Sequence, residues 1–252
     1  MGYGSPTVVG KSNADHLRES LRRGRILGTF VKLPATEAID IAAGAGFDFV
    51  IVDLEHSQLS DESASRLVRH ASAAGFPCVV RIPSCDRGTI NRLLEAGAAG
   101  VQLSSVRSIS QVRDLVASTT YPPHGERSIS LAHPAAGYGR VPLREAAAAP
   151  PPLLVGQIET AETDDPLTSI IGAGLDVAFV GVTDLTVEMG FDGARVEARV
   201  KEIQEAATAA GVALGMFVKD PAAIPSEARY VALSSDLAML REALAKAASD
   251  AR

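Results

Sequence analysis

The stretch FVIVDLEHSQ, residues 49–58, places a fully apolar run directly beside ionisable side chains. A short continuous run of this kind is typical of a strand that is buried on both faces of a parallel sheet. Within four residues the run gives way to Asp53, Glu55 and His56. Two interpretations are open: the strand enters a solvated loop, or it ends at an active site.

The same pattern, a short apolar strand followed by a helix or helical turn, recurs along the chain. We predict strands over residues 26–33, 47–56, 77–83, 99–106, 153–160, 176–182, 212–218 and 230–235. Eight such units within 252 residues are typical of an α/β TIM (β/α)8 barrel. A doubly wound open sheet is the alternative, but it needs a glycine-rich phosphate turn after its first strand, where this chain has KLPATEA.

These boundaries predict residues 1–25 as an N-terminal arm with a short helix and residues 26–252 as one barrel domain. A Pro/Gly-rich segment at about residues 120–152 interrupts the rhythm, and loops of this length in compact domains are often functional. Ser60 is predicted to cap the helix that follows the quoted stretch.

Composition excludes several classes of function. The net charge is −6 with acids and bases interspersed, so no basic surface for nucleic acid is indicated. The chain has no apolar run long enough for a membrane span, and its first residues lack the apolar core of a signal peptide. Two cysteines fit a reducing compartment. We expect a cytoplasmic protein with neither nucleic-acid nor membrane partners.

Active sites of TIM barrels lie where the strands end, at their carboxyl side. The predicted strand ends carry the following polar residues: Lys32, Asp53, Glu55, His56, Arg81, Gln102, Ser104, Ser105, Gln157, Glu159, Thr183, Asp184, Lys219, Asp220, Ser234 and Ser235. One mouth would therefore collect a histidine, an arginine and several carboxylates.

This set of residue types favours metal-assisted chemistry. Glu159 and Asp184 end neighbouring strands, and carboxylate pairs suit a hard cation such as Mg²⁺ or Mn²⁺. Arg81 could bind an oxyanion beside the cation, and His56 could act as a general base near neutral pH.

Each residue also has an ordinary structural explanation. Glu159 could be solvated, His56 could be a hydrogen-bonded structural residue, and Arg81 could pair with Asp53 across the rim. A strand-end lysine such as Lys32 could instead form a Schiff base, although nothing local marks it as reactive.

Several motifs together resemble one known family. They are GTFVKLP, AGAGFDFVIVDLEH, VVRIPS, LLEAGAAGVQL, YPPHGERS, AAGYG, VGQIET, VGVTDLTVEMG and YVALSSDLAMLREAL. Over about residues 26–248 the chain resembles the metal-dependent, class II pyruvate aldolases of the HpcH/HpaI type, in the phosphoenolpyruvate/pyruvate barrel superfamily. The resemblance implies a carbon–carbon lyase that reversibly cleaves a 4-hydroxy-2-oxo acid to pyruvate and an aldehyde, through an enolate stabilised by Mg²⁺ or Mn²⁺, with Co²⁺ as an alternative.

The resemblance also implies roles for individual residues. It assigns Glu159 and Asp184 as metal ligands, Arg81 as the contact to the keto oxygen of pyruvate, and His56 to proton transfer. It assigns Glu95 to the support of the histidine of a neighbouring subunit.

Further positions match the family's substrate-binding residues. These are Gly181 and Thr183 for the pyruvate carboxylate and Gln157 beside the metal. Apart from the resemblance, Asp53 and Glu55 are predicted to support the site from the end of the second strand. The family typically forms hexamers, trimers of dimers that exchange the last helix, so a homo-oligomer is expected here.

Four positions depart from the family pattern, and one of them is Ser128, which stands where glycine is usual. Ser104 and Val182 stand where proline is common, and Pro134 stands where a basic residue is common. Two other functions are therefore kept open: a metal-dependent decarboxylase or C–C hydrolase acting on an oxaloacetate-like 2-oxo acid, and a ligand-binding barrel without catalysis.

Overall fold

The chain folds into a closed barrel of parallel strands that neighbour each other in sequence order, from β1 to β8 and back to β1. The computed structural model describes residues 12–252. Its strands are β1 Ile26–Val31, β2 Phe49–Asp53, β3 Cys78–Ile82, β4 Gly100–Leu103, β5 Leu153–Ile158, β6 Val177–Val180, β7 Ala213–Val218 and β8 Tyr230–Ser235. Closure confirms the predicted TIM barrel and excludes the open doubly wound sheet, which would have two edge strands.

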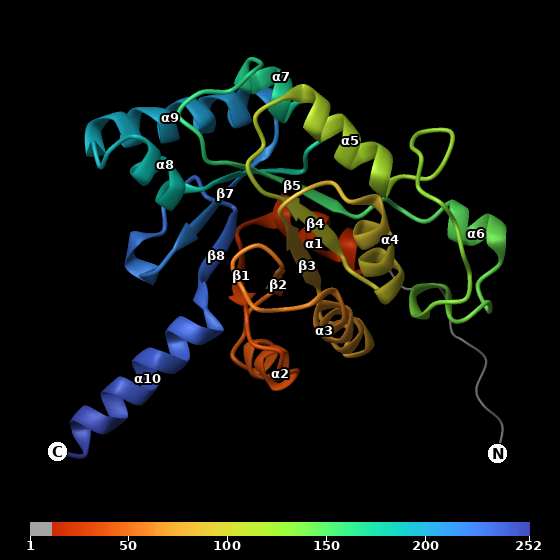
Figure 1. Cartoon of the computed structure of the whole chain (residues 1–252), viewed down its shortest axis with the longest axis horizontal. Coiled ribbons are helices and arrows are strands. Elements are labelled where there is room, and N and C mark those ends of the chain that lie inside the picture. Colours follow the sequence, from red (N-terminus) through yellow and green to blue (C-terminus); the bar gives the residue numbers. More distant parts are fainter. Residues whose placement is uncertain (1–11) are drawn as a thin grey trace.

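Helices surround the barrel (Figure 1). They are α1 Asn13–Arg23, α2 Glu37–Gly44, α3 Asp61–Ala73, α4 Arg87–Ala96, α5 Ile109–Thr119, α6 Leu143–Ala147, α7 Leu167–Ile171, α8 Val182–Glu188, α9 Gly193–Ala210 and α10 Asp236–Asp250, with two short 3₁₀ helices, η1 Pro134–Ala136 and η2 Pro221–Ala223. The segment 120–152 thus contains η1 and α6, which the sequence analysis did not predict.

Side-chain caps fix where several helices begin after a strand. The Ser60 Oγ accepts a hydrogen bond from the Ser63 amide at 3.2 Å, as predicted for the start of α3. The Asp86 carboxylate accepts from the Thr89 amide at 2.7 Å at the start of α4. Because these caps lie at the carboxyl ends of β2 and β3, they hold the loops at the barrel mouth.

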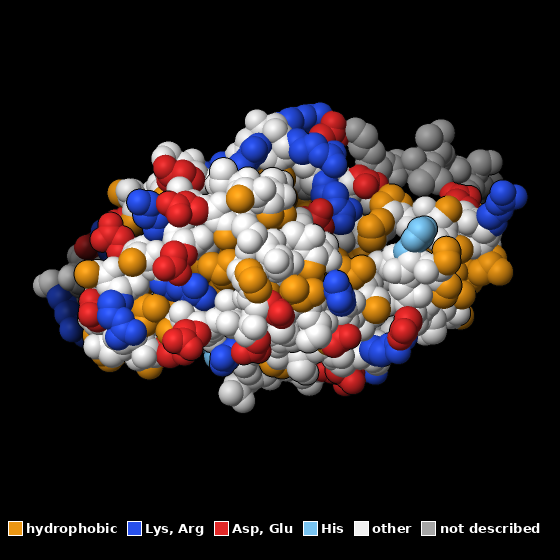
Figure 2. Space-filling view, turned by 90° about the horizontal axis from the view of Figure 1, so that it is seen from above, with side chains coloured by type: hydrophobic (Ala, Val, Ile, Leu, Met, Phe, Trp, Pro, Cys, Tyr) orange, Lys and Arg blue, Asp and Glu red, His pale blue; other side chains and the backbone are white. Residues whose placement is uncertain are grey.

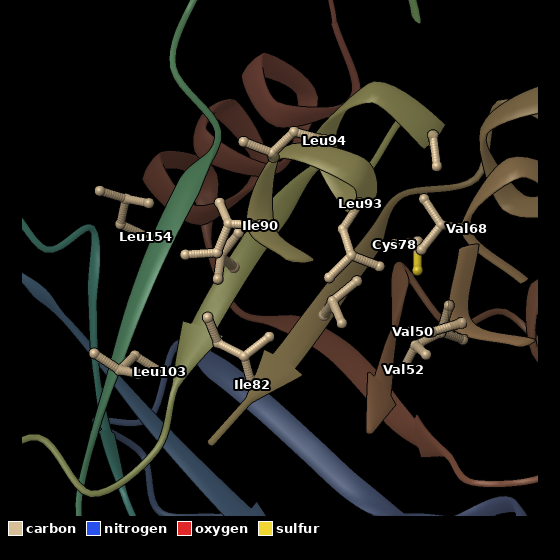
Figure 3. Close-up of a cluster of buried hydrophobic side chains, with 14 of the residues drawn as sticks. Val50, Val52, Val68, Cys78, Ile82, Ile90, Leu93, Leu94, Leu103 and Leu154 are labelled. Carbon is tan, nitrogen blue, oxygen red and sulfur yellow. The ribbon is translucent and has the colours of Figure 1, made fainter. Parts of the chain in front are cut away.

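Two apolar layers stabilise the barrel. Outward-facing strand residues such as Val50, Val52 and Ile82 pack beneath the helices, as Figure 3 shows. A second cluster fills the interior: Leu17, Leu21, Ile26, Phe30, Phe49, Ile51, Val79, Ala99, Leu153, Val155, Val177, Phe179, Tyr230 and Ala232. With a side-chain period of two, the inward row of β2 continues from Ile51 to Asp53, at the top of this filled interior.

Helix α1 belongs to the barrel core rather than to a detached arm. Leu17 and Leu21 join the interior cluster, and Leu17 is fully buried. Arg18 binds the Asp176 carboxylate through Nε and Nη2, at 2.8 Å each. Residues 1–11 of the predicted arm lie outside the part of the chain that the structure describes.

Helix α10 is fixed to the barrel near its start. The Asp236 carboxylate accepts hydrogen bonds from the amides of Lys32 and Leu33, at the end of β1. The helix then projects away from the barrel (Figure 1). Its apolar side chains Leu240 and Leu244 are 48% and 62% exposed. Within residues 12–252, an apolar stripe on this projecting helix is thus left without cover.

Charged side chains are mixed over the surface. Figure 2 shows acidic and basic groups interspersed over one face of the molecule. Within residues 12–252, none of the helices is both long enough and apolar enough to span a membrane.

The packing of α1 predicts a large loss of stability when Leu17 is truncated. Leu17→Ala should lower the free energy of unfolding by about 2–5 kcal/mol, the range for truncating a fully buried leucine. The exposed Arg22 of the same helix is the control, and Arg22→Ala should change it by at most about 0.5 kcal/mol. Urea unfolding measures both free energies. A loss for Leu17→Ala as small as that for Arg22→Ala would mean that Leu17 contributes little to the core.

Candidate active site

Asp53, the last residue of β2, is completely buried and fully paired. Arg81 lies directly opposite it on β3 and donates to both carboxylate oxygens, from Nε at 2.8 Å and from Nη2 at 2.6 Å. The Lys32 ammonium lies 2.9 Å from the same carboxylate. The backbone amides of Glu55 and His56 donate to it at 3.1 and 3.2 Å. One carboxylate thus organises the ends of three neighbouring strands.

The charges around Asp53 decide its protonation state. Burial by itself disfavours the carboxylate, but the hydrogen bonds and charge of Arg81, followed by the hydrogen bond of Lys32, outweigh it and hold the pKa of Asp53 well below its usual range. Arg81 is itself only 6% exposed, and its guanidinium carbon lies 4.6 Å from the centre of the Phe30 ring. The structure therefore shows the pairing of Arg81 with Asp53 that the sequence left open.

Glu55 extends this network toward the opening. Its Oε2 lies 3.1 Å from Arg81 Nη1 and accepts a hydrogen bond from Ser104 Oγ at 2.6 Å. The His56 Nε2 is 3.7 Å from the same oxygen, beyond hydrogen-bond distance, and the side chain is 58% exposed. The His56 side chain is thus accessible at the mouth, beside the Glu55 carboxylate.

Glu159 forms a second, acidic part of the mouth. It follows β5 and is 5% exposed. Its Oε1 accepts hydrogen bonds from the backbone amide and the hydroxyl of Ser105, at 2.8 and 2.7 Å. Its Oε2 accepts from Gln157 Nε2, and the Gln157 Oε1 in turn accepts from Gln102 at 2.7 Å. The carboxylate is held firmly by neutral donors.

The surroundings of Glu159 fit a bound cation. Burial raises the pKa of Glu159, and the nearby charges of Glu55 and Asp184 raise it further, while the bonds from Gln157 and Ser105 only partly offset this. No lysine or arginine is among its hydrogen-bond partners in the described chain. A buried acid beside two other acids is stabilised by a positive ion. Since no three His, Cys, Asp or Glu side chains within residues 12–252 form a complete ligand set, substrate or water oxygens would have to complete its shell.

Asp184 and Thr183 lie on a helix rather than at a strand end, which corrects the sequence prediction. Strand β6 stops at Val180, and α8 begins at Val182. Both side chains occupy the first turn of α8 and are exposed. Backbone amides in a first helical turn have no partner within the helix, so those of α8 can face a carboxylate.

Gly181 has a structural role beside Glu159. Its amide donates to the carbonyl of Ile158 at 3.0 Å, so this amide is occupied by the barrel. A Cβ atom at Gly181 would come within 2.5 Å of the Glu159 side chain. Only glycine allows this close approach, so Gly181 makes room for Glu159.

Two residues of the prediction lie outside the acidic part of the mouth. Glu95 is near the carboxyl end of α4, where the chain returns to the opposite end of the barrel, and its Oε1 accepts from Asn91 Nδ2 at 3.2 Å. Glu95 and His56 are therefore not brought together within one chain. Lys32 binds Asp53 and the His56 carbonyl, whereas a Schiff-base lysine must be a free amine.

Ser104 donates to Glu55, and Ser105 donates to Glu159. The sequence predicted both serines at the mouth but gave neither a role. The only signal was their position just after the fourth strand. Glu188 was also missed: its carboxylate accepts from the Ala161 amide at 2.8 Å and so ties α8 to the loop after Glu159.

The buried pair predicts a strongly non-additive effect on stability. Arg81→Met should cost about 3–5 kcal/mol, because it leaves the Asp53 charge buried with one partner fewer. Adding Asp53→Asn removes that charge, so the double variant should be less destabilised than the sum of the two single losses. Urea unfolding of the four proteins in the cycle measures this. Additive losses would contradict an energetic coupling between the two side chains.

Comparisons with known proteins agree with this geometry. A family model described as HpcH/HpaI aldolase/citrate lyase matches residues 26–242. The chain is 32% identical to a hydroxypyruvate/pyruvate aldolase of Paraburkholderia phytofirmans, covering 90% of this chain and 93% of the relative. It is also 32% identical to a 4-hydroxy-2-oxo-heptane-1,7-dioate aldolase of Salmonella arizonae, covering 88% and 89%.

A solved structure shows the same fold. The crystal structure of an HpcH/HpaI aldolase/citrate lyase family protein from Burkholderia cenocepacia superposes with a TM-score of 0.85 at 28% identity, covering 94% of this chain and 99% of that one. The matched region contains all eight strands, the network around Asp53 and Arg81, and the acidic part of the mouth around Glu159. The chain therefore belongs to the HpcH/HpaI aldolase/citrate lyase family.

Proposed function

We propose that the protein is a carbon–carbon lyase that reversibly cleaves a 4-hydroxy-2-oxo acid to pyruvate and an aldehyde. The observation that carries this proposal is a buried acid, Glu159, held beside Asp184 on one side of the mouth, with the buried guanidinium of Arg81 near Glu55 on the other. The names of the two aldolase relatives support the same class of reaction.

Glu159 and Asp184 are the proposed ligands of a divalent cation, Mg²⁺ or Mn²⁺, with Co²⁺ as an alternative. When bound, the cation would supply Lewis-acid polarisation of the oxygens of the 2-oxo acid. Gln157 and Ser105 keep the Glu159 carboxylate in one orientation. The first turn of α8, with Thr183, offers backbone amides to the substrate carboxylate.

Arg81 is proposed to stabilise negative charge on the keto oxygen as the enolate forms. A guanidinium has five N–H donors on three nitrogens. Asp53 and Glu55 contact each nitrogen once, so N–H groups remain for the substrate. Because these two acids fix the guanidinium plane, no reorganisation is needed when charge develops on the substrate.

His56 is proposed to move the proton of the substrate hydroxyl. In the cleavage direction the imidazole takes the proton from the C4 hydroxyl, the C3–C4 bond breaks, and its electron pair remains on the pyruvate fragment as the enolate. A proton then adds to C3 and pyruvate is released. The exposed position of His56 at the mouth is compatible with contact to the aldehyde part of the substrate.

The metal assignment predicts complete dependence on a divalent cation and no Schiff base. Pyruvate release from a series of 4-hydroxy-2-oxo acids should require Mn²⁺, stop in excess EDTA, and leave no borohydride-trapped adduct with pyruvate, because Lys32 is bound by Asp53. Glu159→Gln should abolish turnover, whereas Glu162→Gln, an exposed acid of the same loop, should not.

Three other outcomes would replace this proposal. Full activity in excess EDTA would rule out the metal. Turnover of oxaloacetate-like acids alone would indicate the decarboxylase or hydrolase, and binding without any turnover would indicate a barrel that only binds ligands.

We also propose that the protein is a homo-oligomer, a hexamer formed as a trimer of dimers, in which α10 packs on a neighbouring barrel. The exposed leucines of the projecting helix support this, since an apolar stripe needs cover. Glu95 supports it too, because it can assist a histidine only across an interface. The free thiols Cys78 and Cys85 support the inferred cytoplasmic location.

The assembly proposal predicts that polar residues on the stripe dissociate the protein. Wild type should scatter light as a dimer or hexamer, and Leu240→Glu together with Leu244→Glu should shift it to smaller species with loss of activity. Glu242→Gln, an exposed residue on the opposite face of the same helix, is the control and should leave the assembly intact. A wild-type monomer with full activity would contradict both the exchange of α10 and the role of Glu95.

A further inference from the structure

Two consecutive serines, Ser104 and Ser105, contact the two parts of the mouth from a single point in the chain. They follow β4, which lies between the strand that carries Arg81 and the strand that leads to Glu159. Ser104 donates to Glu55, and Ser105 donates to Glu159. The two acceptors are far apart in sequence, and the charge of Glu55 acts on Glu159.

Ser104 is placed to hold Glu55 against the arginine. It is 1% exposed, and its hydroxyl is 2.6 Å from the same Glu55 oxygen that lies 3.1 Å from Arg81 Nη1. Its amide donates to the carbonyl of Ile82 at 3.1 Å, so the backbone continues the barrel hydrogen bonds. The hydroxyl is therefore the part of Ser104 that acts on the mouth.

The backbone conformation of Ser105 places this residue to hold Glu159. Its φ is +50°, in the left-handed region that is uncommon for residues other than glycine. In this conformation its amide and its hydroxyl both donate to one oxygen of Glu159, at 2.8 and 2.7 Å. A residue kept in an unfavourable conformation with both donors on one acid indicates a positioning role.

We infer that Ser104 and Ser105 are positioning residues that hold two mutually repelling acids apart, Glu55 with the arginine and Glu159 with the cation. This inference rests on the proposed function, since it takes Glu159 as a metal ligand and Arg81 as the enolate contact. Outer hydrogen bonds of this kind fix the orientation of a metal ligand and the position of a charged group. Each serine should then affect a different measurable step.

Metal binding should report on Ser105. Manganese affinity, measured by electron paramagnetic resonance of free Mn²⁺, should fall about 10- to 100-fold in Ser105→Ala, the range for loss of a hydrogen bond to a metal ligand. Ser105→Gly keeps the amide and suits the positive φ, so it isolates the hydroxyl and should also weaken Mn²⁺. Manganese affinity of Ser104→Ala should equal that of wild type.

Turnover at saturating Mn²⁺ should report on Ser104. Ser104→Ala should lower kcat of aldol cleavage about tenfold, since a hydrogen bond to a charged group is lost and Glu55 no longer fixes the guanidinium. Once Mn²⁺ is saturating, Ser105→Gly should recover most of its kcat. Ser118→Ala, a buried serine of α5 away from the mouth, is the matched control and should alter neither quantity.

The outcomes separate the two proposals. Wild-type Mn²⁺ affinity in Ser105→Gly would overturn the role of the hydroxyl, and identical changes of both quantities in Ser104→Ala and Ser105→Ala would overturn the division between the serines. Unchanged Mn²⁺ affinity in Glu159→Gln would instead show that the cation site itself is misassigned, and the proposed function would fall together with this inference.

Discussion

The ion pair between Asp53 and Arg81 is the constraint on which the rest of the mouth depends. Asp53 ends the inward row of β2 where the apolar interior stops, and it has no exposed surface. A charge in that position is stable only if it is paired and hydrogen-bonded. Arg81, Lys32 and two backbone amides meet this requirement, and in doing so they fix the ends of β1, β2 and β3 and the turn that carries His56.

The mouth has two chemically different parts, one in which acids and cations pair and one that holds acids. At the ends of the first three strands, Arg81 and Lys32 pair with Asp53. Within residues 12–252, no lysine or arginine is hydrogen-bonded to Glu159, which follows β5 and feels the charge of Asp184 on α8. An added divalent ion would balance the acidic part, and a 2-oxo acid between the two parts would contact that ion on one side and the guanidinium of Arg81, fixed by Asp53 and Glu55, on the other. This arrangement favours an anion and the additional negative charge of an enolate.

Most of the barrel could be predicted because its strands are continuous apolar runs, and β8 falls at the predicted residues 230–235. Strand six was predicted too long, since Val182 continues the apolar run although Gly181 has already ended the strand and α8 begins. The same rule placed Asp53, Glu55 and Glu159 at strand ends, whereas Asp184 lies on α8. The bonds of Ser104 and Ser105 could not be found, because they depend on a left-handed turn and on barrel closure, which no local pattern shows. Exchange of α10 involves a second chain and stays a prediction.

The most direct test of the central claim is hydrogen exchange at the methyl group of pyruvate, followed by NMR in D₂O. This reaction needs enolate formation alone and is independent of the aldehyde. With Mn²⁺ the wild-type protein should replace the methyl hydrogens with deuterium, and the exchange should stop in excess EDTA and in Glu159→Gln but continue in Glu162→Gln. Exchange at the wild-type rate in excess EDTA, or in Glu159→Gln, would contradict the account.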